Sequence, residues 1–221
     1  MMELRRAAEP FEFYSRLNLT LLTGRQARDL AELLENLRSV PESVVYHHTH
    51  RLLIQHQFLS PEPPNDFAYW VSNILLEEHL GEELASIDLL RFGTIRELRE
   101  ELIRVIQNHL ERASDVRAAP PGMEFFFMRS VSFILKTGLR AQDLKEFGDA
   151  LKHVSLSSIS YHVFDARLRL ESGDNDFSRW IENALGESEL AAKLRSLDPY
   201  THTEEGLRGA MIAAINRRLG D

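Results

Sequence analysis

The stretch TGRQARDLAELLENLRSVPESVVYHH, residues 23–48, recurs 114 positions later as TGLRAQDLKEFGDALKHVSLSSISYH, residues 137–162. The two stretches are identical at ten of 26 positions. Two further segments recur in the same order: residues 65–88 as 175–198, and residues 94–110 as 203–219. Similarity at a nearly fixed spacing indicates an internal repeat, so we expect two similar halves in a chain of 221 residues.

The repeat sets the expected boundaries. An N-terminal tail covers residues 1–10, the first half 11–113 and the second half 123–221. The linker between the halves, residues 114–122, contains Pro120, Pro121 and Gly122, which favour a turn over a helix.

Four helices are expected in each half. The first begins at Thr23 or Thr137, where Thr23 and Gln26 have the spacing of a capping box. The others are expected over residues 42–58, 66 onward and 95 onward, and over 156–171, 176 onward and 204 onward in the second half. In residues 11–22 and 125–136, aromatic and apolar side chains alternate with other residues at period two, so a short strand at the start of each half is possible. The predicted fold is therefore mainly α, with two tandem homologous helical halves related by a pseudo-twofold axis.

Composition narrows the class of protein. The net charge is −8, which disfavours binding to nucleic acid or to an anionic membrane surface. The chain has no cysteine, so thiolate metal sites and cysteine nucleophiles are excluded. Without a secretory signal or a membrane-spanning apolar run, the expected location is the cytoplasm.

A histidine cluster at residues 47, 48, 50 and 56 is the most tempting candidate for a metal site. No pair has the i, i+4 spacing typical of a zinc helix, and Tyr161 and Phe164 stand where the repeat would place a second His47 and His50. We therefore expect no metal and no other cofactor. His48 recurs as His162, on the predicted apolar side of its helix, where a buried histidine with satisfied nitrogens is the simplest interpretation.

The segment Asn65-Asp66-Phe67, with Trp70 and Asn73, recurs as Asn175-Asp176-Phe177, with Trp180 and Asn183. Helix capping by the aspartates and core anchoring by the aromatic rings explain this pattern structurally. The functional alternative is a pocket with a ring as its wall and an amide that orients a ligand. The candidate binding residues that follow are His48, Trp70, Asn73 and Arg99, with their counterparts His162, Trp180, Asn183 and Arg208.

Arg99 and Arg208 recur together with Asp88 and Asp198, which predicts a salt bridge between the last helix and the third. No phosphate-binding loop, Rossmann fingerprint, nucleophile elbow or HExxH motif is present, so no residue is assigned as catalytic.

The strings TGRQARDLAELL, NDFAYW and VSNILLEEHLGEELASID, with TGLRAQDLKEF, SISYHVFDARLRL and NDFSRWIENAL, resemble an uncharacterised prokaryotic family of unknown function with an internally duplicated helical unit. The resemblance implies a compact helical protein and no known activity. The favoured function is a non-catalytic binding or regulatory module for a small ligand or a protein partner. The alternative is a metal-assisted hydrolase that uses His48 and Asp66, or His162 and Asp176.

Overall fold

The computed structural model describes residues 5–51, 65–112, 117–166, 174–197 and 202–220. The chain divides into two compact units. Unit 1 contains residues 1–17 and 132–221, and unit 2 contains residues 18–131. The divisions fall inside two long strands and not in the proline-containing segment 114–122.

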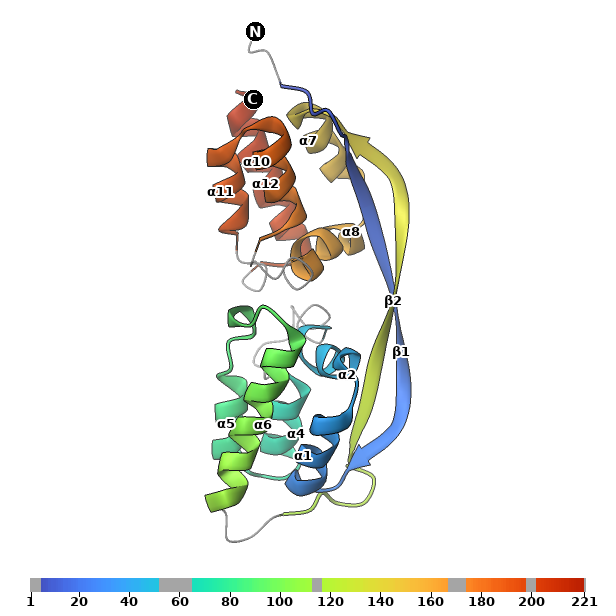
Figure 1. Ribbon diagram of the computed structural model, residues 1–221, viewed down its shortest axis with the longest axis vertical. Helices are drawn as coiled ribbons and strands as arrows, with labels where there is room; N and C mark the ends of the chain where they lie inside the picture. The colour runs from blue at the N-terminus through green and yellow to red at the C-terminus, as the bar shows by residue number, and fades with distance from the viewer. Residues whose placement is uncertain (1–4, 52–64, 113–116, 167–173, 198–201, 221) are drawn as a thin grey trace. The chain divides into compact units, whose positions relative to one another are not determined.

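These strands are β1, Phe11–Ala27, and β2, Phe125–Ala141, which pair in a two-stranded antiparallel ribbon (Figure 1). Each strand is 17 residues long, so the prediction of a mainly α fold with two tandem helical halves about a pseudo-twofold axis is wrong. The fold is mixed α/β. Alternation of buried rings such as Phe11 and Phe13 with more exposed neighbours suits a pleated strand with one covered face.

The strands continue through the residues that were predicted to start the first helices. Thr23 donates its hydroxyl hydrogen bond to the Phe127 carbonyl at 2.6 Å, and Thr137 donates to the Phe13 carbonyl at 2.8 Å. The predicted capping box at Thr23 is therefore wrong. The first helices begin after Asp29 and Asp143, whose carboxylates accept from the backbone N–H groups three residues later.

In unit 2, α1 spans Leu30–Ser39 and α2 spans Glu42–Tyr46, followed by the π-helix η1, His47–Arg51. Next come α4, Asp66–Asn73, α5, Glu78–Ala85, the 3₁₀ turn η2, Leu89–Arg91, and α6, Ile95–Arg112. Their apolar sides surround residues from the first part of β2. The buried core includes Leu33, Leu37, Val44, Phe67, Leu80, Leu98, Phe125 and Phe127.

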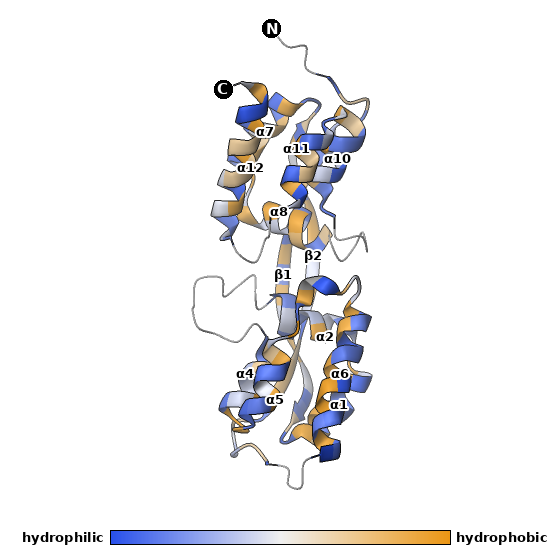
Figure 2. Cartoon of the chain, turned by 90° about the vertical axis from the view of Figure 1, so that its left-hand side faces the viewer, coloured by the Kyte–Doolittle hydropathy of each residue, from blue (hydrophilic) through white to orange (hydrophobic). Residues whose placement is uncertain are grey.

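In unit 1, α7 spans Leu144–His153 and α8 spans Leu156–Ser160, followed by the π-helix η3, Tyr161–Asp165. Next come α10, Asp176–Leu185, α11, Ser188–Arg195, and α12, Glu204–Leu219. Here the first part of β1 enters the core. The helices of either unit carry both hydrophobic and hydrophilic residues (Figure 2). The buried residues of unit 1 include Phe13, Phe147, Phe177, Ile181, Leu194, Leu207 and Ile215. Phe13 is the counterpart, in the repeat, of Phe127 in unit 2.

The continuous second helices predicted over 42–58 and 156–171 become a short α-helix and a π-turn in the described part of the chain. Residues 52–58 and 167–171 lie outside the described residues, as do the predicted loop 59–64, His56, Asp198 and residues 113–116. Within the residues that are described, no helix has the length and apolar character needed to cross a membrane.

Candidate functional site

His162 lies in the π-turn η3 and connects two elements of unit 1. Its Nδ1 is 2.7 Å from Oδ2 of Asp176, the first residue of α10. Its Nε2 accepts a hydrogen bond of 2.9 Å from the backbone N–H of Tyr14 in β1. Because a backbone N–H only donates, Nε2 carries no proton and Nδ1 donates to the carboxylate. The ring is therefore neutral, and it is 3% exposed.

His48 has the same arrangement in unit 2. Its Nδ1 is 2.7 Å from Oδ2 of Asp66, and its Nε2 accepts from the Met128 N–H at 2.9 Å. The ring is 1% exposed and lies against Phe125, with 4.7 Å between ring centroids. Both recurring histidines thus have both nitrogens engaged, as expected for buried polar groups. The aspartates bind these histidines, and the helix caps are Asn65 and Asn175.

A histidine that binds a metal ion or acts as a general base needs a free lone pair on its imidazole ring. In both rings the lone pair of Nε2 already accepts a hydrogen bond from a backbone N–H. Among the described residues, no three His, Asp or Glu side chains are grouped as metal ligands would be. His47 and His50 are buried, and burial lowers the pKa of each to about 4. His47 is 2.8 Å from the Ser130 hydroxyl through Nδ1, and His50 is 3.1 Å from the Thr49 hydroxyl.

The two recurring arginines bind backbone. Arg99 donates from Nη2 to the carbonyl of Val40, which ends α1, and Arg208 donates to the carbonyl of Val154, which ends α7, both at 2.8 Å. A cation at the C-terminus of a helix satisfies an orphan carbonyl and interacts favourably with the helix dipole. The predicted Arg99–Asp88 salt bridge is not formed, and Arg208's predicted partner Asp198 lies outside the described residues.

Trp70 and Asn73 have structural contacts in unit 2. Trp70 is 5% exposed, and its Nε1 donates to the Met123 carbonyl at 2.8 Å. Asn73 donates its amide to the Tyr69 carbonyl, one turn earlier in α4, at 3.0 Å. In unit 2, Trp70 is therefore a core anchor and the Asn73 amide binds backbone, as the structural interpretation of this segment predicted.

The counterparts in unit 1 line an open groove of about 420 Å³. His162 and Asp176 lie in its wall, and Trp180 and Asn183 come from successive turns of α10. Trp180 is only partly buried and stacks on Phe147, with 5.4 Å between centroids and 22° between the ring planes. Asn183 is exposed, with no hydrogen-bond partner among the described residues. The groove thus joins three of the eight candidate residues.

Several groove residues were missed in the sequence because they do not recur, among them Tyr14, Tyr161, Arg179 and Glu12. Tyr14, Tyr161 and Arg179 stand where the repeat places Met128, His47 and Tyr69. Two further rings and a guanidinium group therefore line the groove of unit 1, and Glu12 adds a carboxylate. The signal that could have found them is this divergence beside the shared His, Asp, Trp and Asn residues.

A model of a family described as a family of unknown function (DUF5752) matches residues 8–216. The chain belongs to this family. Among solved structures, the chain is similar to the one titled "The structure of OrfY from Thermoproteus tenax". The two are 34% identical, the match covers 98% of each chain, and the TM-score is 0.81. A search of curated proteins found no match.

Proposed function

We propose that this protein is a non-catalytic binding module and that the groove of unit 1 holds a small ligand. The observation that carries the proposal is the grouping of Trp180, Asn183 and the rings of Tyr14 and Tyr161 around one opening of about 420 Å³. This volume lies within the usual range for small-molecule sites, roughly 300–1,000 Å³. The cytoplasmic location expected from the sequence remains part of the proposal.

The lining suggests the chemistry of the ligand. Partly exposed aromatic rings provide flat apolar walls for an aromatic or other planar group. The Asn183 amide offers both a donor and an acceptor, and Arg179 offers a forked donor for an anionic substituent. A small aromatic acid combines these features.

The fixed state of His162 supports binding over catalysis. Its neutral ring holds Asp176 through one nitrogen and β1 through the other, so proton transfer at Nε2 would first break the hydrogen bond from Tyr14. The alternative of a metal-assisted hydrolase requires the same nitrogen to be free. The hydrogen-bonded pair of His162 and Asp176 instead holds the wall of the groove in place, which reduces the entropic cost of binding.

A thermal-shift titration with benzoate, 4-hydroxybenzoate and indole-3-acetate tests the proposal, because a ligand that binds only the folded state raises the melting temperature. At least one acid should raise it in the wild type. Asn183→Ala and Trp180→Ala should abolish the increase, whereas the matched variant Asn73→Ala in unit 2 should retain it. The proposal fails if none of the acids stabilises the wild type, or if Asn183→Ala and Asn73→Ala respond alike.

A further inference from the structure

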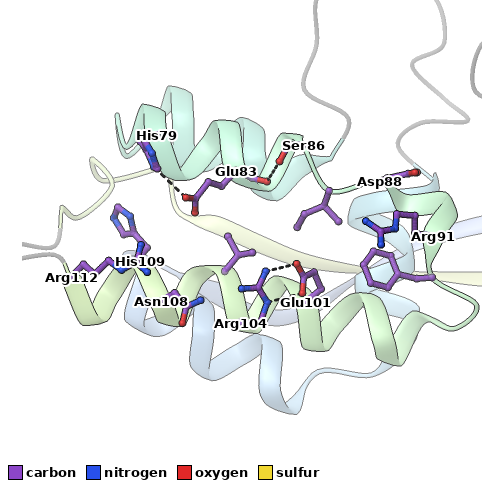
Figure 3. A pocket seen from close by; sticks show the side chains of 13 residues that line it. His79, Glu83, Ser86, Asp88, Arg91, Glu101, Arg104, Asn108, His109 and Arg112 are labelled. Carbon is purple, nitrogen blue, oxygen red and sulfur yellow. Dashed lines mark hydrogen bonds and ion pairs between the residues drawn. The ribbon is translucent and has the colours of Figure 1, made fainter.

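A second groove, of about 470 Å³, lies within unit 2 between α5 and α6 (Figure 3). One face of α6 supplies residues at helical spacing: Glu101, Arg104, Val105, Asn108, His109 and Arg112. The α5 side supplies His79, Glu83, Ser86 and Ile87, and the turn between the helices supplies Asp88, Arg91 and Phe92. The groove is independent of the one in unit 1, with which it shares no residue.

Three arginines are spread along this groove. Figure 3 shows Arg91 and Arg112 at opposite ends, with Arg104 between them. Arg104 and Arg112 are eight positions apart on one helix, which corresponds to about 12 Å along its axis. His79 and His109 add imidazole rings near the Arg112 end. Three carboxylates, those of Glu83, Asp88 and Glu101, line the same groove, so the arginines that they leave unpaired decide whether the groove can hold an anion.

The carboxylates in the groove are partly engaged already. Glu101 forms a two-pronged salt bridge with Arg104, at 2.8 and 2.6 Å, which lowers the pKa of the Glu101 carboxyl. Glu83 is 3.5 Å from His79 Nδ1, and Glu77 is 3.6 Å from His109 Nε2, so both imidazoles of the groove already lie beside a carboxylate. Among the described residues, Arg91 and Arg112 have no ion-pair partner. Two guanidinium groups at the ends of the groove thus remain for an external anion.

The repeat shows that the fold does not require these charges. Ala210 and Ala213 of α12 occupy the positions of Glu101 and Arg104, and Glu189 of α11 occupies that of His79. Arg99, by contrast, recurs as Arg208, with the same bond to a helix-ending carbonyl. Arg99, which has a structural task, thus recurs, whereas His79, Glu101 and Arg104 in the lining of this groove do not; among the charged lining residues, Asp88 does recur, as Asp198.

We propose that the groove between α5 and α6 binds a small anion that carries more than one phosphoryl group. Guanidinium groups bind phosphoryl oxygens in a forked, bidentate manner. Donors spread over about 12 Å favour a chain of linked phosphoryl groups over a single one, because only an extended anion reaches more than one arginine. Asn108 supplies a further side-chain amide beside Arg104.

Isothermal titration with inorganic tripolyphosphate, orthophosphate and citrate at low ionic strength tests this. Tripolyphosphate should bind the wild type more tightly than orthophosphate and citrate. Arg112→Gln and Arg91→Gln should each weaken its binding on the order of tenfold, as expected for one lost charge-assisted contact. The matched control is Arg96→Gln, which removes the same charge from an exposed residue of α6 outside the groove.

Three outcomes would overturn the proposal. The first is no measurable binding of tripolyphosphate to the wild type. The second is an equal loss of affinity in Arg96→Gln and Arg112→Gln, which would mean that only overall charge matters. The third is binding of citrate as tightly as tripolyphosphate, which would remove the preference for phosphoryl groups. Far-ultraviolet circular dichroism of each variant verifies that the fold is intact before titration.

Discussion

Replacing His50 with phenylalanine should make the stability of unit 2 less dependent on pH. His50 is 5% exposed, and burial is the main reason why its pKa falls from 6.5 to about 4. A hydrogen bond to the backbone of Leu89 opposes this shift. Phe164 occupies the same position of the repeat in unit 1 and is also 5% exposed, so a phenyl ring suits this type of site.

The sign follows from the lowered pKa. The unfolded state binds a proton at His50 more readily than the folded state. The free energy of unfolding therefore keeps its full value above a pH of about 6.5 and decreases as the pH falls toward about 4. One pKa unit corresponds to about 1.4 kcal/mol, so the whole shift is worth on the order of 3 kcal/mol. Roughly 2 kcal/mol of this is lost between pH 7 and pH 5.

Urea unfolding at several pH values between 5 and 7 measures this effect. A Trp180→Phe background makes the fluorescence report on Trp70, which lies in unit 2. His50→Phe should lose about 2 kcal/mol less than the parent over this range. His79→Gln, which removes an exposed histidine of the same unit, controls for the loss of one imidazole. Parallel pH profiles for His50→Phe and its parent would refute the reasoning.

Three other perturbations test the fold. Leu76 has φ +57°, a left-handed conformation that is strained for a residue with a Cβ, and the repeat places Gly186, with φ +72°, at the same position. Leu76→Gly should therefore raise the free energy of unfolding by about 0.5–1 kcal/mol, and a lower urea midpoint would contradict this. Trp70→Ala should lower the free energy of unfolding by roughly 3–5 kcal/mol and Trp180→Ala by clearly less, because Trp70 is buried and Trp180 is only partly buried. Equal losses for the two variants in urea unfolding would contradict this. After cleavage at a protease site inserted in residues 117–122, the fragments should co-elute in gel filtration, because each unit contains strand residues from both; separate elution would count against this arrangement.

Local signals predicted much of the helical structure. Thr203 caps α12 through its side chain, and Thr94 accepts from the Glu97 N–H in the same way. The third helices begin within one residue of the predicted start, but the prediction that Asp66 and Asp176 cap them is wrong, because the caps are Asn65 and Asn175. Capping depends on residues three apart, so one sequence contains the information.

The strands could not be predicted in the same way. Thr23 has the composition of a helix cap, yet its hydroxyl donates to Phe127, more than 100 positions away. Gly24 and Gly138 have φ of +76° and +81° inside the strands, a left-handed conformation that glycine adopts without the steric cost of a Cβ. Alternation over residues 11–22 indicated a strand but not its length or its partner. The groove residues Tyr14 and Tyr161 come together for the same non-local reason.

The ribbon also explains why histidine recurs where it does. In a two-stranded sheet each strand is an edge strand, so every second backbone N–H points away from its partner. The N–H groups of Tyr14 and Met128 point into aromatic cores, where an unpaired donor would cost roughly 1–3 kcal/mol. A neutral imidazole accepts a hydrogen bond from this N–H through Nε2 and donates a hydrogen bond from Nδ1 to the carboxylate of Asp176 or Asp66. An aliphatic side chain lacks the acceptor, and a protonated histidine lacks the lone pair. The feature that most resembled a catalytic dyad in the sequence is thus the link that fastens each strand to its helices, and sites for ligands are to be sought where the two halves of the repeat differ.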